Sequence, residues 1–255
     1  MVRMRELLEA VAAGDRTPAE AEAELAGYAT TDAGRFDATR EQRAGVPEAI
    51  LADGKRAAEV ADLAATAVET TGRAIVTRLD DTAATAVSRS LDDAVTVQWS
   101  ERSDWLVATG PDFERPDIPA TVGVVTGGTS DRVPAGEAAV IVREMGASVT
   151  RIDDVGVASL ARTVDAVERL RGQDVLVVAA GREGALPTVV AGLVDTPVIG
   201  LPVSTGYGHG GEGEAALSGM LQSCTSLSVV NIDAGFTAGA QAGLIARQVA
   251  DARGD

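Results

Sequence analysis

The residues best suited to covalent chemistry are Cys224 and Glu183, and Cys224 is the only cysteine in the chain. Cys224 follows a helix-like run and precedes an apolar stretch that reads as a buried strand. Two interpretations stay open, because a thiolate can act as a nucleophile, whereas a free cysteine often packs as a small apolar residue. Glu183 stands between glycines at a predicted helix start, where a carboxylate can act as a base or simply favour the helix dipole.

Further polar loops follow the predicted strands of the C-terminal half. In the loop 126–131, Ser130 or Asp131 could cap the next helix, or the backbone near Gly128 could hold a phosphate. The glycine-rich loop 204–213 carries the only histidine, His209, which could contact a ligand or simply be solvated. A site at these strand ends would also include Gly184, Ala185, Ser204, Tyr207 and Asp233.

A parallel sheet would bring these loops together. Apolar runs rich in valine are typical of strands buried on both faces, and they occur at 121–126, 174–180, 197–203 and 227–232, with a weaker one at 147–152. Between them lie helical patterns, including one face made of Leu160, Val164, Val167 and Leu170. We therefore predict an α/β fold for residues 119–255, a doubly wound parallel sheet in a three-layer sandwich.

The first part of the chain, residues 1–110, predicts a smaller N-terminal α/β domain. Helices are expected at 3–13 and 17–28, the second with Thr17 as N-cap, Pro18 at its first position and Glu20 completing a capping box. Further helices are expected at 48–52, 55–70 and 82–91, and strands at 74–80 and 94–100. The proline-rich residues 111–118 are expected to form a linker.

The charge and the composition exclude several classes of protein. The net charge is −16, so we expect neither nucleic acid nor an anionic membrane as a partner. The N-terminus has no apolar core of a signal peptide and no stretch is long enough to span a membrane. A single cysteine cannot form a disulfide within the chain, which favours a reducing, cytoplasmic location. One cysteine and one histidine also cannot build a closed zinc site. Lys55 is the only lysine, and the acidic, arginine-based composition suggests adaptation to high intracellular salt.

Several motifs, taken in order, carry a resemblance to a known family. They are GGTSD (127–131), EGALP (183–187), PVIGLPVSTGYG (197–208), MLQSC (220–224) and VVNIDAGF (229–236), with FDATREQRAGVPEAILADGK (36–55) upstream. Over residues 36–247 the chain resembles the LarB family, the pyridinium-3,5-biscarboxylic acid mononucleotide synthases of nickel-pincer nucleotide cofactor biosynthesis. The C-terminal half is similar, more distantly, to the aminoimidazole ribonucleotide carboxylases of purine synthesis, which implies a flavodoxin-like, PurE-like fold.

The resemblance implies a carboxylase and hydrolase that acts on nicotinic acid adenine dinucleotide. Carbon dioxide or bicarbonate would be the co-substrate, the phosphoanhydride would be cleaved to release AMP, and no organic cofactor is expected. The match places the nucleophile at Cys224 and the base at Glu183. Ser130 and Asp131 would hold the phosphate or ribose, and the segment 37–48 would cover the nucleotide through Asp37, Arg40, Arg43 and Glu48. Magnesium is plausible for the anhydride cleavage, although no ligand set is visible.

The sequence departs from these families at several positions. Arg182 stands where an aliphatic residue or methionine is usual in the LarB family, Ala234 stands where asparagine is usual, and a common histidine near Leu160 is absent. The catalytic histidine of the purine carboxylases is also missing from the region 153–165. Carboxylation of aminoimidazole ribonucleotide is therefore the alternative to the LarB-type reaction. A catalytically inactive nucleotide-binding module is the other alternative. The helix before Cys224 should carry it away from Glu183, which predicts a homo-oligomer, by analogy an octamer, with sites shared between chains.

Overall fold

The computed structural model describes residues 4–254, and the chain divides into two compact units between Glu114 and Arg115. Each unit has its own sheet and its own apolar core. Within the described residues, no helix combines the length and the apolar character that crossing a membrane requires.

The N-terminal unit begins with two short helices, α1 (Met4–Ala13) and α2 (Pro18–Ala26). The capping box predicted for α2 is confirmed, because the Thr17 hydroxyl accepts a hydrogen bond from the Glu20 amide at 3.1 Å, and the Glu20 carboxylate accepts one from the Thr17 amide at 2.7 Å. Pro18 opens the helix, where its missing N–H is not needed. Gly27 ends the helix in the left-handed conformation, with φ of 78°.

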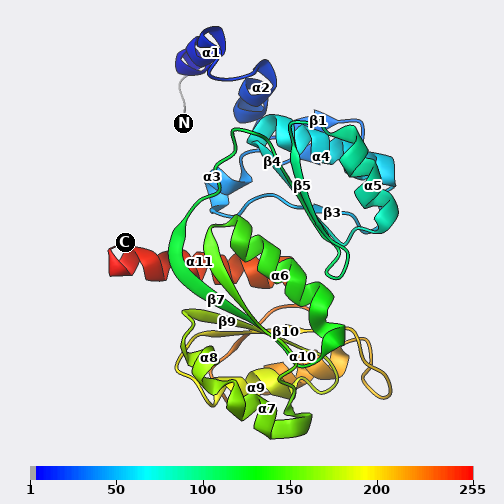
Figure 1. Cartoon of the computed structure of the whole chain (residues 1–255), viewed down its shortest axis with the longest axis vertical. Coiled ribbons are helices and arrows are strands. Elements are labelled where there is room, and N and C mark those ends of the chain that lie inside the picture. The colour runs from blue at the N-terminus through cyan, green and yellow to red at the C-terminus, as the bar shows by residue number, and fades with distance from the viewer. Residues whose placement is uncertain (1–3, 255) are drawn as a thin grey trace. The chain divides into compact units, whose positions relative to one another are not determined.

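A four-stranded sheet forms the centre of this unit. Its order is β3 (Ile50–Leu51), β4 (Arg73–Thr77), β6 (Trp105–Thr109) and β5 (Thr96–Ser100), with β3 parallel to β4 and the other pairs antiparallel. The helices α4 (Ala57–Thr71) and α5 (Asp81–Ser90) pack against each other, and their apolar side chains share one core with β4 and β6. The hairpin β1 (Ala29–Thr31) and β2 (Gly34–Phe36) and the short helix α3 (Arg40–Ala44) complete the unit (Figure 1).

The helix predicted at 48–52 is wrong. Ile50 and Leu51 form strand β3 because they pair with Val76 and Thr77 of β4, and five residues are too few for a stable isolated helix. Strand β6 has no counterpart in the prediction, since a short apolar run between turn residues does not distinguish a strand from a loop. The predicted helix at 82–91 is confirmed as α5, and the Asp80 side chain caps it by accepting from the Ala83 amide at 2.8 Å.

The C-terminal unit is built on a five-stranded parallel sheet in the order β11, β10, β9, β7, β8. The strands are β7 (Ile118–Thr126), β8 (Ala147–Ile152), β9 (Val175–Ala180), β10 (Val198–Pro202) and β11 (Ser228–Val229). The first strand, β7, lies inside the sheet and β8 lies at one edge. The later strands β9, β10 and β11 follow in order toward the other edge. This is the strand order of flavodoxin-like folds, so the predicted doubly wound α/β sheet is confirmed.

Helices cover both faces of this sheet (Figure 1). One face carries α6 (Arg132–Glu144) and α11 (Gly235–Arg253), and the other carries α7 (Leu160–Asp165), α8 (Val167–Arg171), α9 (Ala185–Ala191) and α10 (Glu214–Leu221). Short 3₁₀ turns at Thr129–Asp131 and Val157–Ser159 precede α6 and α7. Adjacent side chains of one strand enter opposite cores, as Val177 and Val178 do, and therefore both must be apolar.

The predicted apolar helix face over 160–170 is wrong. The segment forms two short helices, and Leu160 and Val164 are 58% and 59% exposed, whereas Leu170 is fully buried. Thr163 is buried in their place because its hydroxyl donates to the Val155 carbonyl at 2.8 Å, which satisfies a polar group inside the core.

Two strand boundaries also differ from the prediction. The run 227–232 contains only a two-residue edge strand, since β11 pairs with β10 at Ser228 and Val229 alone. Ile118 belongs to β7 rather than to a linker, and the pairing of β7 with β8 shifts between Ile118 and Thr121. Pro119 lies at this irregularity, where a strand tolerates a residue without an N–H donor.

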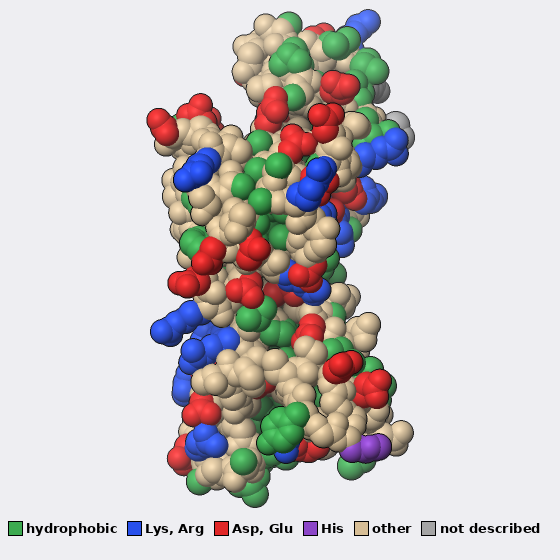
Figure 2. Space-filling view, turned by 90° about the vertical axis from the view of Figure 1, so that its right-hand side faces the viewer, with side chains coloured by type: hydrophobic (Ala, Val, Ile, Leu, Met, Phe, Trp, Pro, Cys, Tyr) green, Lys and Arg blue, Asp and Glu red, His purple; other side chains and the backbone are tan. Residues whose placement is uncertain are grey.

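Figure 2 shows both acidic and basic side chains on the view that it draws, with several basic side chains close together at the left of its lower half. Several arginines are held by nearby carboxylates, for example Arg151 by Asp153 at 2.9 Å and Arg162 by Asp154 at 2.7 Å. Such pairing offsets the positive charge of these arginines locally.

Candidate active site

The loops that follow the strands of the C-terminal unit meet at one edge of the sheet. Hydrogen bonds connect them in series, because the Gly127 amide donates to the Ala179 carbonyl at 3.2 Å and the Asp233 amide donates to the Pro202 carbonyl at 2.9 Å. The Ser204 amide then donates to Asp233 Oδ1 at 2.9 Å. The parallel arrangement therefore brings Gly128, Glu183, Ser204 and Asp233 to the same edge, as the sequence predicted.

The loop after β7 is organised around Asp131. This carboxylate is 4% exposed, and it accepts hydrogen bonds from the Gly128 amide at 2.8 Å and from the Ser130 hydroxyl at 3.4 Å. Burial raises the pKa of Asp131 above its usual value, although the hydrogen bonds from the amides of Gly128 and Gly127 act in the opposite direction. Asp131 thus orders the loop from within, but its side chain accepts no hydrogen bond from the first turn of α6 and so does not cap that helix.

The loop after β9 presents Glu183 on the surface, next to the start of α9. Two of its residues have left-handed backbones, Arg182 with φ of 53° and Gly184 with φ of 66°. A β-carbon on Gly184 would lie 2.5 Å from the Ala216 carbonyl oxygen, and one on Gly219 of α10 would overlap the Glu183 carbonyl. Helix α10 therefore packs directly on the backbone of Glu183 and Gly184 and holds this stretch of the loop in place.

The glycine-rich loop after β10 forms the other wall of a cavity of about 390 Å³. Glu183, Arg182, Tyr207 and His209 all line this cavity. Tyr207 is 83% exposed, and the Arg182 guanidinium carbon lies 4.3 Å from the centre of its ring. Ala185 begins α9 beside the Glu183 loop. The structure thus brings Glu183, Arg182, Tyr207 and His209 together.

Cys224 is an exposed free thiol. Its interpretation as a core-packing residue is therefore wrong. The neighbouring hydroxyls of Ser223 and Thr225 are 2.7 Å apart, and the Ser223 hydroxyl also accepts from the Thr225 amide at 3.2 Å. These bonds close a tight turn with Cys224 at its tip, which leaves the thiol accessible to a ligand.

Within one chain, Cys224 and Glu183 lie at opposite ends of α9. Glu183 precedes the first turn of this helix, whereas Gly192, just past its end, would place a β-carbon 4.0 Å from Cγ2 of Thr225. Seven helical residues span about 10 Å. The thiol is also not among the residues that line the cavity beside Glu183. The two predicted catalytic groups are therefore not brought together in the single chain.

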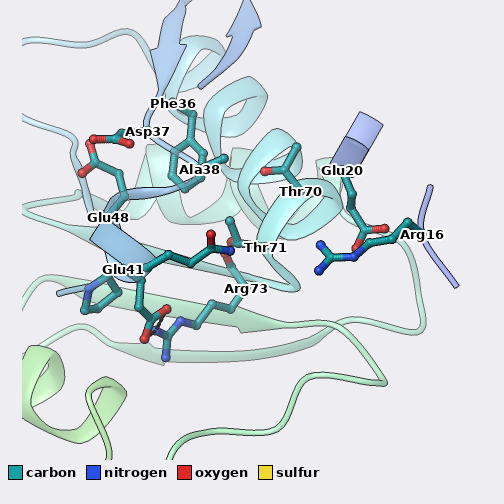
Figure 3. Close-up of a pocket in the computed structure, with 12 residues that line it drawn as sticks. Arg16, Glu20, Phe36, Asp37, Ala38, Glu41, Glu48, Thr70, Thr71 and Arg73 are labelled. Atoms are coloured by element: carbon teal, nitrogen blue, oxygen red, sulfur yellow. Dashed lines mark hydrogen bonds and ion pairs between the residues drawn. The ribbon is translucent and has the colours of Figure 1, made fainter. Parts of the chain in front are cut away.

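The N-terminal unit contains a second cavity, of about 330 Å³ (Figure 3). Asp37 and Glu48 line it, whereas Arg43 binds Asp37 at 2.6 Å and Arg40 binds Glu48 at 2.7 Å. The Arg43 guanidinium holds the pKa of Asp37 below its usual value. The four predicted residues thus form two ion pairs at the rim of one cavity.

Two residues of this cavity were not identified from the sequence. Arg73 has a side chain only 3% exposed, and both oxygens of Glu41 accept from its Nη2, at 2.8 and 2.7 Å. Its guanidinium carbon also lies 4.8 Å from the centre of the Phe113 ring. Figure 3 shows Arg73 and Glu41 pointing toward each other at the cavity. Glu41 lies within the predicted segment 37–48 without being singled out there, and no sequence signal marks Arg73, which simply begins a strand.

The sequence departures fall at defined places. Arg182 lines the cavity beside Glu183, whereas Ala234 immediately precedes α11 and is half-buried. Leu160 begins α7 and is exposed. Among residues 4–254, no group of three or more His, Cys, Asp or Glu side chains is arranged to hold a metal ion.

Comparisons with known proteins agree with this architecture. Residues 121–254 match the family model described as AIR carboxylase, and residues 28–109 match the model of the LarB/PurE-like N-terminal domain. The chain is also 37% identical over 224 residues, which cover 84% of each sequence, to an uncharacterized protein of Methanocaldococcus jannaschii.

Proposed function

The chain belongs to the AIR carboxylase family and carries a LarB/PurE-like N-terminal domain, and on this premise we propose that it carboxylates the pyridinium ring of nicotinic acid adenine dinucleotide. Hydrolysis of the phosphoanhydride by one water molecule would release AMP and leave pyridinium-3,5-biscarboxylic acid mononucleotide. The observation that carries the proposal is the exposed, free thiol of Cys224 in a chain whose two units both match this family.

A pyridinium ring is too electron-poor to attack carbon dioxide by itself. Addition of the Cys224 thiolate forms a carbon–sulfur bond, and the ring nitrogen takes up an electron pair, which leaves a neutral enamine. The nucleophilic enamine carbon then forms a carbon–carbon bond to carbon dioxide. Glu183 removes the proton from this carbon, the freed pair restores the enamine, and loss of the thiolate restores the aromatic ring.

The separation of Cys224 from Glu183 supports a site shared between copies of the chain. Because the two groups lie at opposite ends of α9, one chain would supply the thiolate and another the carboxylate. An assembly of this kind, such as an octamer, is a symmetric homo-oligomer in which each interface is used repeatedly. Both the oligomer and a cytoplasmic location stay proposals.

Magnesium also stays a proposal. The described residues contain no group of three or more carboxylate, thiol or imidazole side chains that could hold an ion. Mg²⁺ commonly binds through substrate phosphates and one or two carboxylates, with water as its other ligands. We therefore expect the ion to enter with the phosphoanhydride, whose charge it would neutralise.

The test is incubation of the purified full chain with nicotinic acid adenine dinucleotide, ¹³C-bicarbonate and Mg²⁺ at high salt. Mass spectrometry should detect a labelled dicarboxylated mononucleotide together with AMP. The Cys224→Ser variant should form no product and still bind the dinucleotide, whereas Ser226→Ala, at an exposed neighbour in the same turn, should act like the native chain. Product formation by Cys224→Ser would rule out the thiolate mechanism.

The alternative reaction is carboxylation of aminoimidazole ribonucleotide, because residues 121–254 match the AIR carboxylase model itself. The same assay with this nucleotide as substrate separates the two reactions by the mass of the product. Binding of nicotinic acid adenine dinucleotide without turnover of either substrate would instead favour a catalytically inactive nucleotide-binding module.

A further inference from the structure

The guanidinium of Arg182 is held by an aromatic ring and not by a carboxylate. Its carbon lies 4.3 Å from the centre of the Tyr207 ring, and among the described residues no acidic side chain pairs with it. A cation over a ring uses the face of the guanidinium plane. The N–H donors along its edge remain available, and their fork geometry matches the two oxygens of a carboxylate or phosphate.

The position of Arg182 directs these donors to the predicted reaction site. Arg182 comes from the loop after β9 and Tyr207 from the loop after β10, and both line the cavity of about 390 Å³ together with Glu183. A β-carbon on Gly206 would lie 3.6 Å from the Arg182 amide nitrogen, so the two loops also approach each other at the backbone. The left-handed φ of 53° at Arg182 turns its side chain across this gap toward Tyr207.

The charge of the cavity makes Arg182 important for an anionic ligand. The other charged residue of the lining is Glu183, and the whole chain carries a net charge of −16. An anion entering beside Glu183 would be repelled by this carboxylate and by the acidic surface. Arg182 supplies the opposite charge at short range, where screening by salt is weakest.

We propose that Arg182 is a specificity-determining residue that binds an anionic group of the substrate, a carboxylate or a phosphate, and that Tyr207 positions its guanidinium. This inference rests on the proposed function, because it names the substrate group that the reaction site would recognise. Arg182 binds the substrate, whereas Tyr207 acts through Arg182.

The experiment measures the dissociation constants of two dinucleotides by isothermal titration calorimetry at fixed salt. Nicotinic acid adenine dinucleotide carries a ring carboxylate, and nicotinamide adenine dinucleotide carries an amide in its place, with the same phosphates. The variants are Arg182→Met, which removes the guanidinium but keeps an unbranched side chain, and Arg102→Met, which makes the same charge change at an exposed turn of the N-terminal unit.

Arg182→Met should weaken binding of the acid dinucleotide about tenfold or more, the usual size for a lost charge-assisted pair. A loss confined to the acid dinucleotide assigns Arg182 to the ring carboxylate, and an equal loss for both dinucleotides assigns it to the phosphates. Tyr207→Phe should keep the native affinity because the ring face remains, whereas Tyr207→Ala should weaken binding in the same pattern as Arg182→Met.

The inference is overturned if Arg182→Met binds both dinucleotides as tightly as Arg102→Met does. It is also overturned if the native chain binds neither dinucleotide. The proposed function can fail separately from this inference. If the native chain binds the acid dinucleotide through Arg182 but forms no carboxylated product, the inference stays intact. Product formation with an unchanged affinity in Arg182→Met would overturn this inference alone.

Discussion

Replacing Gly184 by alanine should disturb the loop that carries Glu183 more than it disturbs the rest of the fold. Gly184 has φ of 66°, and a β-carbon there would lie 2.5 Å from the Ala216 carbonyl oxygen and 2.9 Å from the Ala216 Cα. Real β-carbons essentially never approach closer than 3.0 Å, so the two backbones must separate by at least 0.5 Å. Because Glu183 is the preceding residue, this displacement moves the proposed base.

The expected loss of stability has two parts. An alanine in the left-handed region costs about 1 kcal/mol, and overpacking against backbone costs about 1–3 kcal/mol more. Gly184→Ala should therefore lower the free energy of unfolding by about 2–4 kcal/mol. Gly254→Ala is the matched control, because Gly254 has φ of 79° in the same unit and a β-carbon there meets nothing within 4 Å. It should lose at most about 1 kcal/mol.

Urea denaturation measures the stability, and the carboxylation assay at a temperature where the variant is folded measures kcat. A displacement of half an ångström at a reacting group should lower kcat by about tenfold or more, while Gly254→Ala stays at the native rate. The reasoning is refuted if Gly184→Ala loses no more stability than Gly254→Ala and turns over substrate at the native kcat.

Three further predictions concern the buried charges and the shared site. Since burial raises the pKa of Asp131, its stabilising contribution is complete below the pKa of the unfolded chain and is lost as pH rises through the folded pKa. Urea titrations across the acid range should therefore show Asp131→Asn gaining stability relative to the native chain as pH rises, and a pH-independent difference would contradict this. Glu41→Gln leaves the Arg73 cation buried without its carboxylate partner and should lower the free energy of unfolding by about 1–3 kcal/mol. We expect the lower end of this range because Glu41 is 39% exposed and solvent screens the pair. The Arg73→Met/Glu41→Gln double variant should cost less than the sum of the two single variants in a double-mutant cycle, and simple additivity would argue against a coupled pair. Finally, the Cys224→Ala and Glu183→Gln variants should each be inactive alone. If sites form between chains, an equal mixture of the two variants that is dissociated and reassembled should recover about a quarter of native turnover. No recovery after demonstrated mixing would place both groups in one chain.

Much of the C-terminal sheet could be predicted from the sequence. The runs at 174–180 and 197–203 contain β9 and β10, because a strand covered by helices on both faces must be apolar at every position. The capping box at Thr17 and Glu20 was equally readable, since it depends only on residues three apart in the chain. Loops at the carboxyl ends of parallel strands followed from the same pattern.

Other elements could not be predicted, because they depend on distant partners. Ile50 and Leu51 form a strand only because β4 offers them an edge, and their local sequence favours a helix equally well. Leu160 and Val164 follow a helical period and still face outward, since the helix ends after six residues and Thr163 finds a buried acceptor. Periodicity indicates an apolar face but not what covers it.

The candidate site divides in the same way. The chemistry-bearing residues, their order along the chain, and the placement of Glu183 and Asp233 at strand ends could all be read from the sequence. The exposure of Cys224, its separation from Glu183 by α9, and the contact of Arg182 with the Tyr207 ring became visible only in the folded chain. The physical reason is that a local pattern sets the direction and burial of a segment's own side chains, whereas the distance between two loops depends on how helices and strands pack between them.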